Sequence, residues 1–313
     1  MNAQEISDDD LPVEWAFVKD KDGYETTETA VASIAAFSDC VSYIWEHKWQ
    51  KARKLLAKKY FQYTEEEFPW FRGICNKNYE LMPCIYWKFK DKSAKQIANI
   101  AEDIREEFKR RGKYFQNQQY RNWEEGEWYQ LMQHYTAPTR LLDWTEGALI
   151  ALYFAVRKQV FSEKPARKTA PCVWMLNPSW LNDISIGTSL PVYLTESAMR
   201  DYRDTDAKAR PYLSEEKLPK YPIAIYPVYN DAKFPAQKSV FTIHGKSLDG
   251  FRELSLLDKN AMLCKILINP DNIAAIAKEL RRLGITESTV FPDLKGLANE
   301  IRNEKGITFS FDR

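Results

Sequence analysis

The sequence is short of the residues that build metal and disulfide sites. It has three histidines and five cysteines spread along 313 residues, and no Cys-x-x-Cys pair occurs. Because zinc sites draw on histidine and cysteine ligands at short spacings, we expect no metal ion here. The odd number of scattered cysteines, most of them in apolar surroundings, predicts reduced and buried thiols.

An excess of charge of one sign and long apolar runs are also missing. The chain carries 45 Lys and Arg residues against 44 Asp and Glu residues, for a net charge of +1. This balance gives no global attraction to nucleic acid or to a membrane, so either kind of binding would need a local patch. No run of 18 apolar residues occurs, and the first residues are polar and acidic, which is typical of neither a transmembrane span nor a signal peptide. We expect a cytoplasmic protein without a membrane partner.

Aromatic residues, in contrast, are abundant. They make up 14% of the chain, with 10 Trp, 17 Tyr and 16 Phe residues. Most of these rings should fill the core, but some could line a groove that stacks a nicotinamide, an adenine or an exposed base.

The pattern of apolar residues predicts an α+β fold. Helical spacing extends over residues 29–49, 97–112 and 124–135, and the almost wholly apolar stretch 144–160 predicts a buried helix. Strands are expected near 15–18 and at 68–74, 172–176, 223–228, 239–243 and 264–268, with helices again at 270–283 and 292–303. Residues 181–221 lack periodicity and predict a long functional or mobile loop. This order favours a mostly antiparallel sheet flanked by helices, with residues 1–67 as a helical extension packed on a domain at 68–313.

Arg72 stands inside the apolar segment WFRGI at 70–74. An unpaired buried charge costs several kcal/mol, so this side chain needs an anionic partner. One interpretation is a structural salt bridge with Asp143 or with a glutamate. The other is a guanidinium fork for the phosphate or carboxylate of a ligand.

Polar and ionisable side chains are concentrated in a second apolar setting, residues 131–144. Asp143 could cap the apolar helix that follows or pair with Arg140, or it could act in catalysis. A histidine titrates near neutrality, so His134 is a candidate general base as well as a candidate hydrogen-bonded orienter. The segment holds the following polar residues: Gln133, His134, Tyr135, Thr136, Thr139, Arg140 and Asp143.

Four blocks of the sequence resemble one known family. FRG at 71–73 with YELMP at 79–83, and QHYTAPTRLLDWT at 133–145 with ALYFA at 151–155, resemble signatures of the FRG domain family. AQKSVFTIHG at 236–245 and VFPDLKGLA at 290–298 are similar to two further blocks. The resemblance spans about residues 68–300. Lys233 and Phe234 depart from it, since family members often carry Arg-Ile before the third block.

This resemblance implies a divergent ADP-ribosyltransferase, in which a split α+β sheet clamps NAD as the substrate. It implies a toxin or effector of bacterial anti-phage defence or of a toxin–antitoxin system, with RNA or DNA as a possible acceptor and a neutralising antitoxin as a partner. Mapped by motif, Arg72 would hold the pyrophosphate or the nicotinamide ribose. The candidate catalytic residues are Arg72, His134, Asp143 and Gln237, and the candidate NAD-binding residues are Arg72, Gly73, Tyr135, Thr139 and Arg140.

The same mapping leaves the catalytic carboxylate open. Gln237 stands in the late block, where transferases usually carry a carboxylate. Asp143, Glu215 or Glu216 could supply the negative charge instead.

A nucleic-acid-binding or nucleolytic module is the alternative from another class. Residues 109–115 interleave basic and aromatic side chains, as single-strand binders do, and residues 48–59 add six positive charges. The same residues could simply be solvated helix faces and a helix C-terminus stabilised by cations. A non-enzymatic sensor of a nucleotide or of a phage component is a third interpretation.

Overall fold

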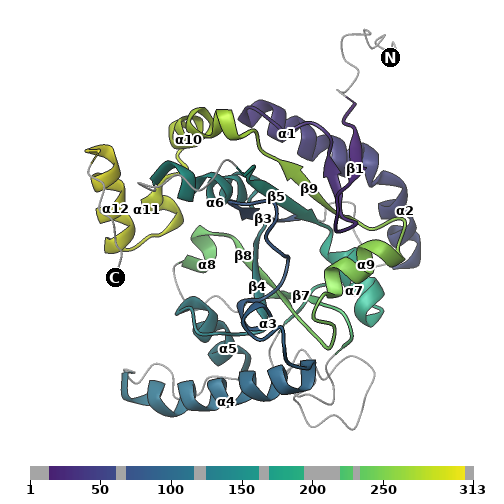
Figure 1. The fold of residues 1–313 in the computed structure, drawn as a ribbon, viewed down its shortest axis with the longest axis vertical. Helices are drawn as coiled ribbons and strands as arrows, with labels where there is room; N and C mark the ends of the chain where they lie inside the picture. Colours follow the sequence, from purple (N-terminus) through teal and green to yellow (C-terminus); the bar gives the residue numbers. More distant parts are fainter. Residues whose placement is uncertain are drawn as a thin grey trace, which may run out of the picture.

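The structure is a computed structural model that describes residues 14–60, 68–115, 125–161, 169–193, 219–227 and 233–306. Within these ranges one nine-stranded sheet runs through the molecule, in the order β1-β2-β9-β5-β3-β4-β8-β7-β6 (Figure 1). Neighbouring strands pair antiparallel except in β2–β9 and β6–β7, so the expected α+β class with a mostly antiparallel sheet is confirmed. The strands are β1 (Phe17–Lys19), β2 (Glu25–Thr27), β3 (Trp70–Ile74), β4 (Leu141–Thr145), β5 (Cys172–Leu176), β6 (Val192–Tyr193), β7 (Ile223–Tyr226), β8 (Ser239–Ile243) and β9 (Leu263–Leu267).

The helices of the described ranges surround this sheet. In Figure 1, α4 and α5 lie at one end of the molecule, and α11 and α12 lie to one side, beyond α8. The helices are α1 (Ile34–Tyr43), α2 (Gln50–Lys59), α3 (Cys84–Lys88), α4 (Ala94–Gly112), α5 (Glu125–His134), α6 (Ala148–Phe161), α7 (Pro178–Ile186), α8 (Lys233–Ala236), α9 (Gly250–Leu257), α10 (Ile273–Arg282), α11 (Glu287–Val290) and α12 (Leu294–Glu304), with a π-helical stretch at Ile44–Lys48 and short 3-10 turns at Lys113–Phe115 and Pro270–Asn272.

Helix α6 packs unusually closely on β3, and Gly73 makes this approach possible. A Cβ atom placed on Gly73 would lie 1.7 Å from the carbonyl oxygen of Ala151 and 2.6 Å from the amide nitrogen of Ala155. Both alanines are fully buried, as is Leu152 between them. The glycine of the FRG sequence therefore serves helix–sheet packing, which fixes where the neighbouring Arg72 can reach.

The stretch at 144–160 is not one helix, as the apolar pattern predicted. Residues Leu141–Thr145 form β4, paired along its length with β8, and the helix starts only at Ala148. Both elements are rich in apolar residues because both are buried, so the boundary between them is marked only by Glu146 and Gly147. Asp143 is consequently the exposed central residue of a strand, and the expected capping role is wrong.

The predicted long loop at 181–221 is also partly ordered as a helix. The side chain of Asn177 accepts a hydrogen bond from the backbone of Trp180, Pro178 occupies the first turn, and Gly187 ends α7 with a φ of 71°. These are the usual start and stop signals of a helix. Residues 194–218, with Glu215 and Glu216, lie outside the described part of the chain.

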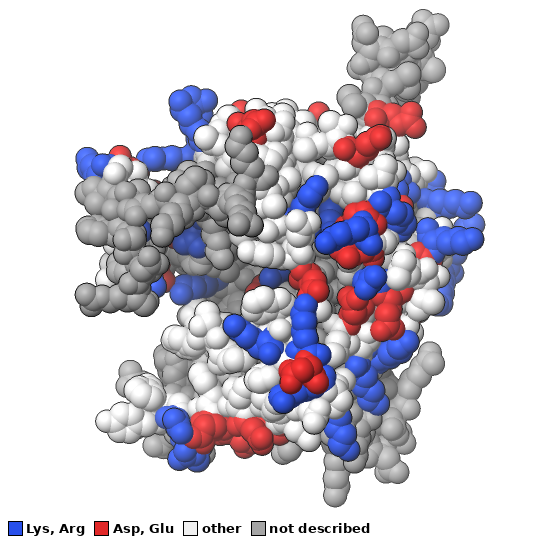
Figure 2. Space-filling model, in the orientation of Figure 1, with Lys and Arg blue, Asp and Glu red and all other residues white. Residues whose placement is uncertain are grey.

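The N-terminal part joins the same sheet. Strands β1 and β2 extend it through the β2–β9 pairing, and α1 and α2 follow them. In the ranges that the structure describes, no helix has both the length and the apolar composition needed to cross a membrane. Figure 2 shows acidic and basic side chains interspersed over the described part of one face, in keeping with a net charge of +1.

Candidate functional site

The sheet opens between its two central strands. Strands β3 and β4 share one register pair, Phe71 with Thr145, whereas each has five pairs with its other neighbour. Beyond that pair the strands separate toward Gly73 and Asp143. The guanidinium of Arg72 spans the opening, and its Nη1 donates a hydrogen bond of 2.6 Å to the backbone carbonyl of Asp143. The side chain thus satisfies a carbonyl that the sheet leaves without a ladder partner.

A pocket of about 370 Å³ lies over this opening, within the range of small-molecule sites. Its floor comes from β3, β4 and β8, and its walls come from α5, α6, α8 and the residue that follows α11. Five phenylalanine rings make the lining strongly aromatic. The lining residues are Phe71, Arg72, Gly73, Gln133, His134, Thr136, Asp143, Trp144, Thr145, Phe154, Lys233, Phe234, Gln237, Ser239, Phe241 and Phe291.

A directed chain of hydrogen bonds orients the carboxylate of Asp143. The hydroxyl of Thr139 accepts from the backbone N–H of Leu141 at 3.1 Å and donates to Oε1 of Gln133. This fixes the amide of Gln133, whose Nε2 then donates to Oδ1 of Asp143 at 2.9 Å. The other carboxylate oxygen lies 3.7 Å from Nη1 of Arg72. Buried Thr139 therefore acts on the pocket through Gln133 and does not line it.

The ion pair between Arg72 and Asp143 is loose. The Arg72 side chain is 27% exposed and that of Asp143 is 57% exposed, with 3.7 Å between the charged atoms. Because the Asp143 carboxylate is open to solvent, this ion pair is worth at most about 1 kcal/mol. Burial lowers the pKa of Arg72, and Asp143 only partly offsets that effect; the guanidinium remains a cation. A ligand anion can therefore replace the Asp143 carboxylate as the ion-pair partner of Arg72.

Two residues with strained backbones flank the pocket. Thr136 has a φ of 59° in the turn after α5, and Lys238 has a φ of 44° just before β8. A left-handed conformation costs a β-branched residue about 1–2 kcal/mol or more, and such strain gathers at functional sites. The strained turn at Thr136 follows His134, whose ring lies in the pocket wall 6.0 Å from the ring of Phe234. Tyr135, between them, is 63% exposed and lies outside the lining.

Gln237 lies where the pocket meets the C-terminal helices. Its Nε2 donates to the carbonyl of Val290 at 3.1 Å, and its own backbone carbonyl accepts from the hydroxyl of Thr145 at 2.6 Å. With the nitrogen engaged, the amide oxygen is the atom that this side chain can offer to a ligand. The structure thus brings Gln237 to the same pocket as Arg72, His134 and Asp143.

Arg140 does not reach the pocket wall. It is buried, and its Nη1 donates to the backbone carbonyl of His244 at 3.2 Å. The expected pairing of Arg140 with Asp143 is therefore replaced by the pairing of Asp143 with Arg72. His244 is also buried; burial, and then the charges of Arg72 and Arg140, lower its pKa to about 3. A neutral imidazole therefore lies close to two guanidinium groups.

Several wall residues were not among the candidate site residues predicted from the sequence. Lys233 and Phe234 come from the short helix α8, and Phe291 comes from the turn between α11 and α12. The Arg157 guanidinium lies 4.6 Å from the centre of the Phe291 ring, which holds that ring against α6. Their blocks at 233–234 and 290–298 were visible as motifs, but nothing local indicated that they meet near β3.

The described residues contain no group of three or more His, Cys, Asp or Glu side chains placed to hold a metal ion.

Comparison with known proteins gives one match. The model of the FRG domain matches residues 68–164, a stretch that runs from the residues before β3 to the end of α6 and includes Arg72, His134 and Asp143. The blocks at 236–245 and 290–298, which supply Gln237 and Phe291, lie beyond the matched residues. No curated protein and no solved structure matches the chain. Residues 68–164 of the chain are thus an FRG domain.

Proposed function

We propose that the protein is an NAD-dependent ADP-ribosyltransferase that acts as a toxin or effector in bacterial anti-phage defence or in a toxin–antitoxin system. One observation carries this proposal. Arg72 lies in the opening between β3 and β4, at the floor of an aromatic pocket that also holds Asp143 and Gln237.

The lining of the pocket supports this proposal, because each step of ADP-ribosyl transfer can be assigned to a residue there. The bond between the nicotinamide nitrogen and the ribose C1′ breaks, nicotinamide leaves with the bonding electrons, and the acceptor nucleophile forms the new bond to C1′. The transition state carries positive charge on the ribose, which an oriented carboxylate such as that of Asp143 stabilises. His134 in the pocket wall is the candidate to take the acceptor's proton.

The loose Arg72–Asp143 pair supports this division of roles. A pyrophosphate offers Arg72 short charge-assisted hydrogen bonds, which are stronger than a contact of 3.7 Å with an exposed carboxylate. Asp143 would keep its hydrogen bond from Gln133 after this exchange.

The acceptor in this proposal is a nucleic acid. Tyr114 and Phe115 are 88% and 83% exposed, next to the basic C-terminus of α4, and exposed rings beside cations suit a single strand. Arg110 and Arg111 both pair with Glu107 along the helix, so the patch is partly neutralised and any such contact would be weak. A neutralising antitoxin protein is the partner that a toxic activity would require.

Nicotinamide release from NAD tests the proposed reaction. The wild-type protein should release nicotinamide and, when it is expressed in bacteria, add an ADP-ribose mass to RNA or DNA rather than to protein. R72A should abolish both, while R252A, which removes an exposed Arg252–Asp249 ion pair elsewhere, should leave both intact. Full turnover by folded R72A would contradict the assignment. Growth arrest without any adduct would favour the nucleolytic or sensor function.

A further inference from the structure

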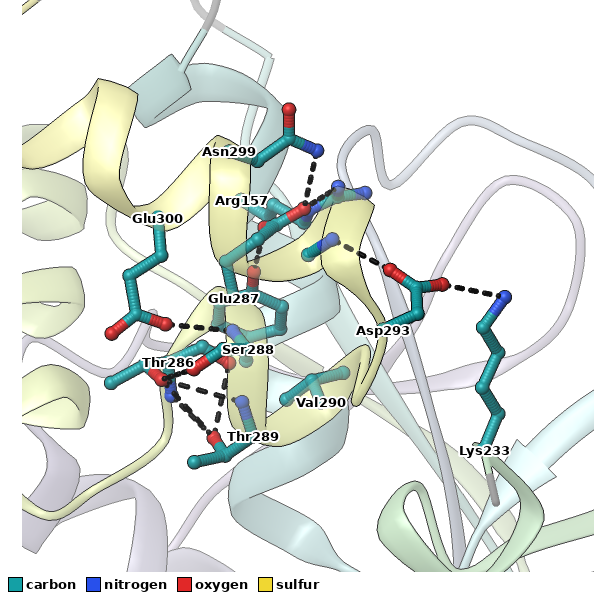
Figure 3. Close-up of polar contacts among 12 residues, drawn as sticks. Arg157, Lys233, Thr286, Glu287, Ser288, Thr289, Val290, Asp293, Asn299 and Glu300 are labelled. Atoms are coloured by element: carbon teal, nitrogen blue, oxygen red, sulfur yellow. Dashed lines mark hydrogen bonds and ion pairs between the residues drawn. The ribbon is translucent and has the colours of Figure 1, made fainter. Parts of the chain in front are cut away.

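The described lining of the pocket includes a second cation, which comes from helix α8. Lys233 begins α8 and lines the pocket, and its side chain is 29% exposed. Its Nζ lies 3.1 Å from Oδ2 of Asp293. Figure 3 shows the extended Lys233 side chain reaching Asp293 from the α8 side, while the other carboxylate oxygen faces the start of α12.

Asp293 has a second task that is separate from this ion pair. It is the N-cap of α12, and its Oδ1 accepts a hydrogen bond of 2.6 Å from the backbone N–H of Gly296. This hydrogen bond, followed by the ion pair with Lys233, lowers the pKa of Asp293. The cap holds the carboxylate in place near the pocket, whereas the lysine contact uses the other oxygen and can be given up without loss of the cap.

Both cations of the pocket are thus matched by a resident carboxylate that is more exposed than the cation itself. Arg72 has Asp143, with exposures of 27% and 57%, and Lys233 has Asp293, with exposures of 29% and 37%. Ion pairs this open to solvent contribute little, and a ligand anion that reaches the cation from inside the pocket competes on favourable terms.

The segment that carries Asp293 is itself firmly attached, so the exchange does not require it to leave. The carboxylate of Glu287 is buried and accepts from Tyr153 and from both Nε and Nη2 of Arg157. Burial alone would raise the pKa of Glu287, but these hydrogen bonds outweigh it and hold that pKa below its usual value. Figure 3 shows this anchor beside the Asp293–Lys233 contact.

We propose that Lys233 is the second anion-binding residue of the pocket, and that it exchanges Asp293 for a ligand phosphate, so that the site selects diphosphates over monophosphates. This inference rests on the proposed function, because it assigns the two phosphates of one dinucleotide to the two cations. The lysine suits this task as a compact charge on a flexible stem, which can turn from the α12 side to the pocket without backbone movement.

Calorimetric titrations with ADP-ribose, which carries two phosphates, and with nicotinamide mononucleotide, which carries one, test this inference without any turnover. K233Q should weaken ADP-ribose binding roughly tenfold to a hundredfold, as expected for loss of a charge-assisted hydrogen bond. It should leave the affinity for nicotinamide mononucleotide within about twofold, a change that would correspond to less than half a kcal/mol.

D293N is the more discriminating variant, because it predicts a gain. Asparagine is as good an N-cap as aspartate, so α12 keeps its cap while the ion pair between Lys233 and residue 293 is lost. ADP-ribose should then bind roughly two- to fivefold more tightly, because it no longer competes with the exposed Lys233–Asp293 ion pair. D249N is the matched control, because Asp249 also precedes a helix and pairs with a basic residue, Arg252, at 3.3 Å; it should change nothing.

The outcomes separate the inference from the proposed function. Three results would overturn the role of Lys233, even if NAD is turned over. They are an unchanged ADP-ribose affinity in K233Q, an equal loss of affinity for ADP-ribose and nicotinamide mononucleotide in K233Q, and no gain of ADP-ribose affinity in D293N. Lys233-dependent binding of ADP-ribose without nicotinamide release would uphold it and count against the transferase. Absence of ADP-ribose binding in every variant would overturn both.

Discussion

Thr139→Val tests whether the pocket depends on the hydrogen-bond chain behind Asp143. Thr139 is 1% exposed, and valine has nearly the same shape, so the substitution removes the hydroxyl and little else. Two hydrogen bonds are lost, from the Leu141 N–H to the hydroxyl and from the hydroxyl to Gln133. The Gln133 amide is then free to rotate and to turn its oxygen toward Asp143.

The magnitude of the stability loss follows from the burial of Leu141. Its backbone N–H would lose its acceptor in a residue that is 2% exposed, which costs about 1–3 kcal/mol. Thr139→Ser keeps the hydroxyl and loses one buried methyl group, for about 1 kcal/mol. Because Asp143 is 57% exposed, loss of its amide donor should weaken NAD binding only about two- to tenfold.

Chemical denaturation and NAD titration of the same two variants make the test. T139V should lose both stability and affinity, whereas T139S should lose stability alone, because it still fixes the amide of Gln133. An affinity of T139V equal to that of the wild type would refute the idea that Thr139 orients Asp143. A loss of affinity in T139S as large as in T139V would refute it as well.

Three further predictions concern stability. G73A should lower the free energy of unfolding by at least 1–3 kcal/mol in chemical denaturation, because its Cβ would lie 1.7 Å from a backbone oxygen. G187A, where the space is open but φ is 71°, should lower it by about 1–2 kcal/mol. Equal small losses in the two variants would contradict the close packing of α6. His244, with its pKa lowered to about 3, stays neutral in the folded state, while in the unfolded state it takes up a proton below pH 6.5. The free energy of unfolding should therefore fall as the pH drops from 6.5 toward 3, by about 2 kcal/mol at pH 5. H244Q should remove that part of the pH dependence, and an unchanged dependence of stability on pH in H244Q would contradict this account. E287Q should lower the free energy of unfolding by roughly 2–4 kcal/mol in the same assay, since it leaves Arg157 without its buried carboxylate partner. A loss within about 0.5 kcal/mol, as expected of an ordinary surface substitution, would mean that the Glu287–Arg157 ion pair does not hold α11 in place.

Much of the sheet could be predicted from the sequence because its strands have local signatures. The stretches at 172–176 and 239–243 are bounded by turn residues and rich in β-branched or aromatic side chains, and both are strands at those positions. The strand Leu141–Thr145 was not predicted because it has the charged Asp143 at its centre and is followed by an apolar helix after only two residues. Local pattern cannot separate two buried elements of different type that are so close in sequence.

Only some of the residues of the candidate site could be predicted from the sequence, for a related reason. Arg72, His134 and Asp143 stood out because each is a charged or titratable residue within an apolar stretch. The pairing of Arg72 with Asp143 was one of the alternatives that the sequence offered, and the structure confirms it. The arrival of Lys233 and Phe291 at the same pocket could not be predicted, because it depends on contacts between distant parts of the chain. No pattern within one segment specifies which side of a strand a remote helix will cover.

Titration of NAD against wild-type protein and R72A tests the central claim most directly, with R252A as the control for loss of an arginine. If the opening between β3 and β4 holds a dinucleotide, wild-type protein and R252A should bind NAD alike. R72A should bind at least about tenfold more weakly, because it lacks the charge-assisted hydrogen bonds to phosphate. Equal binding by all three proteins, with R72A shown to be folded, would contradict the account.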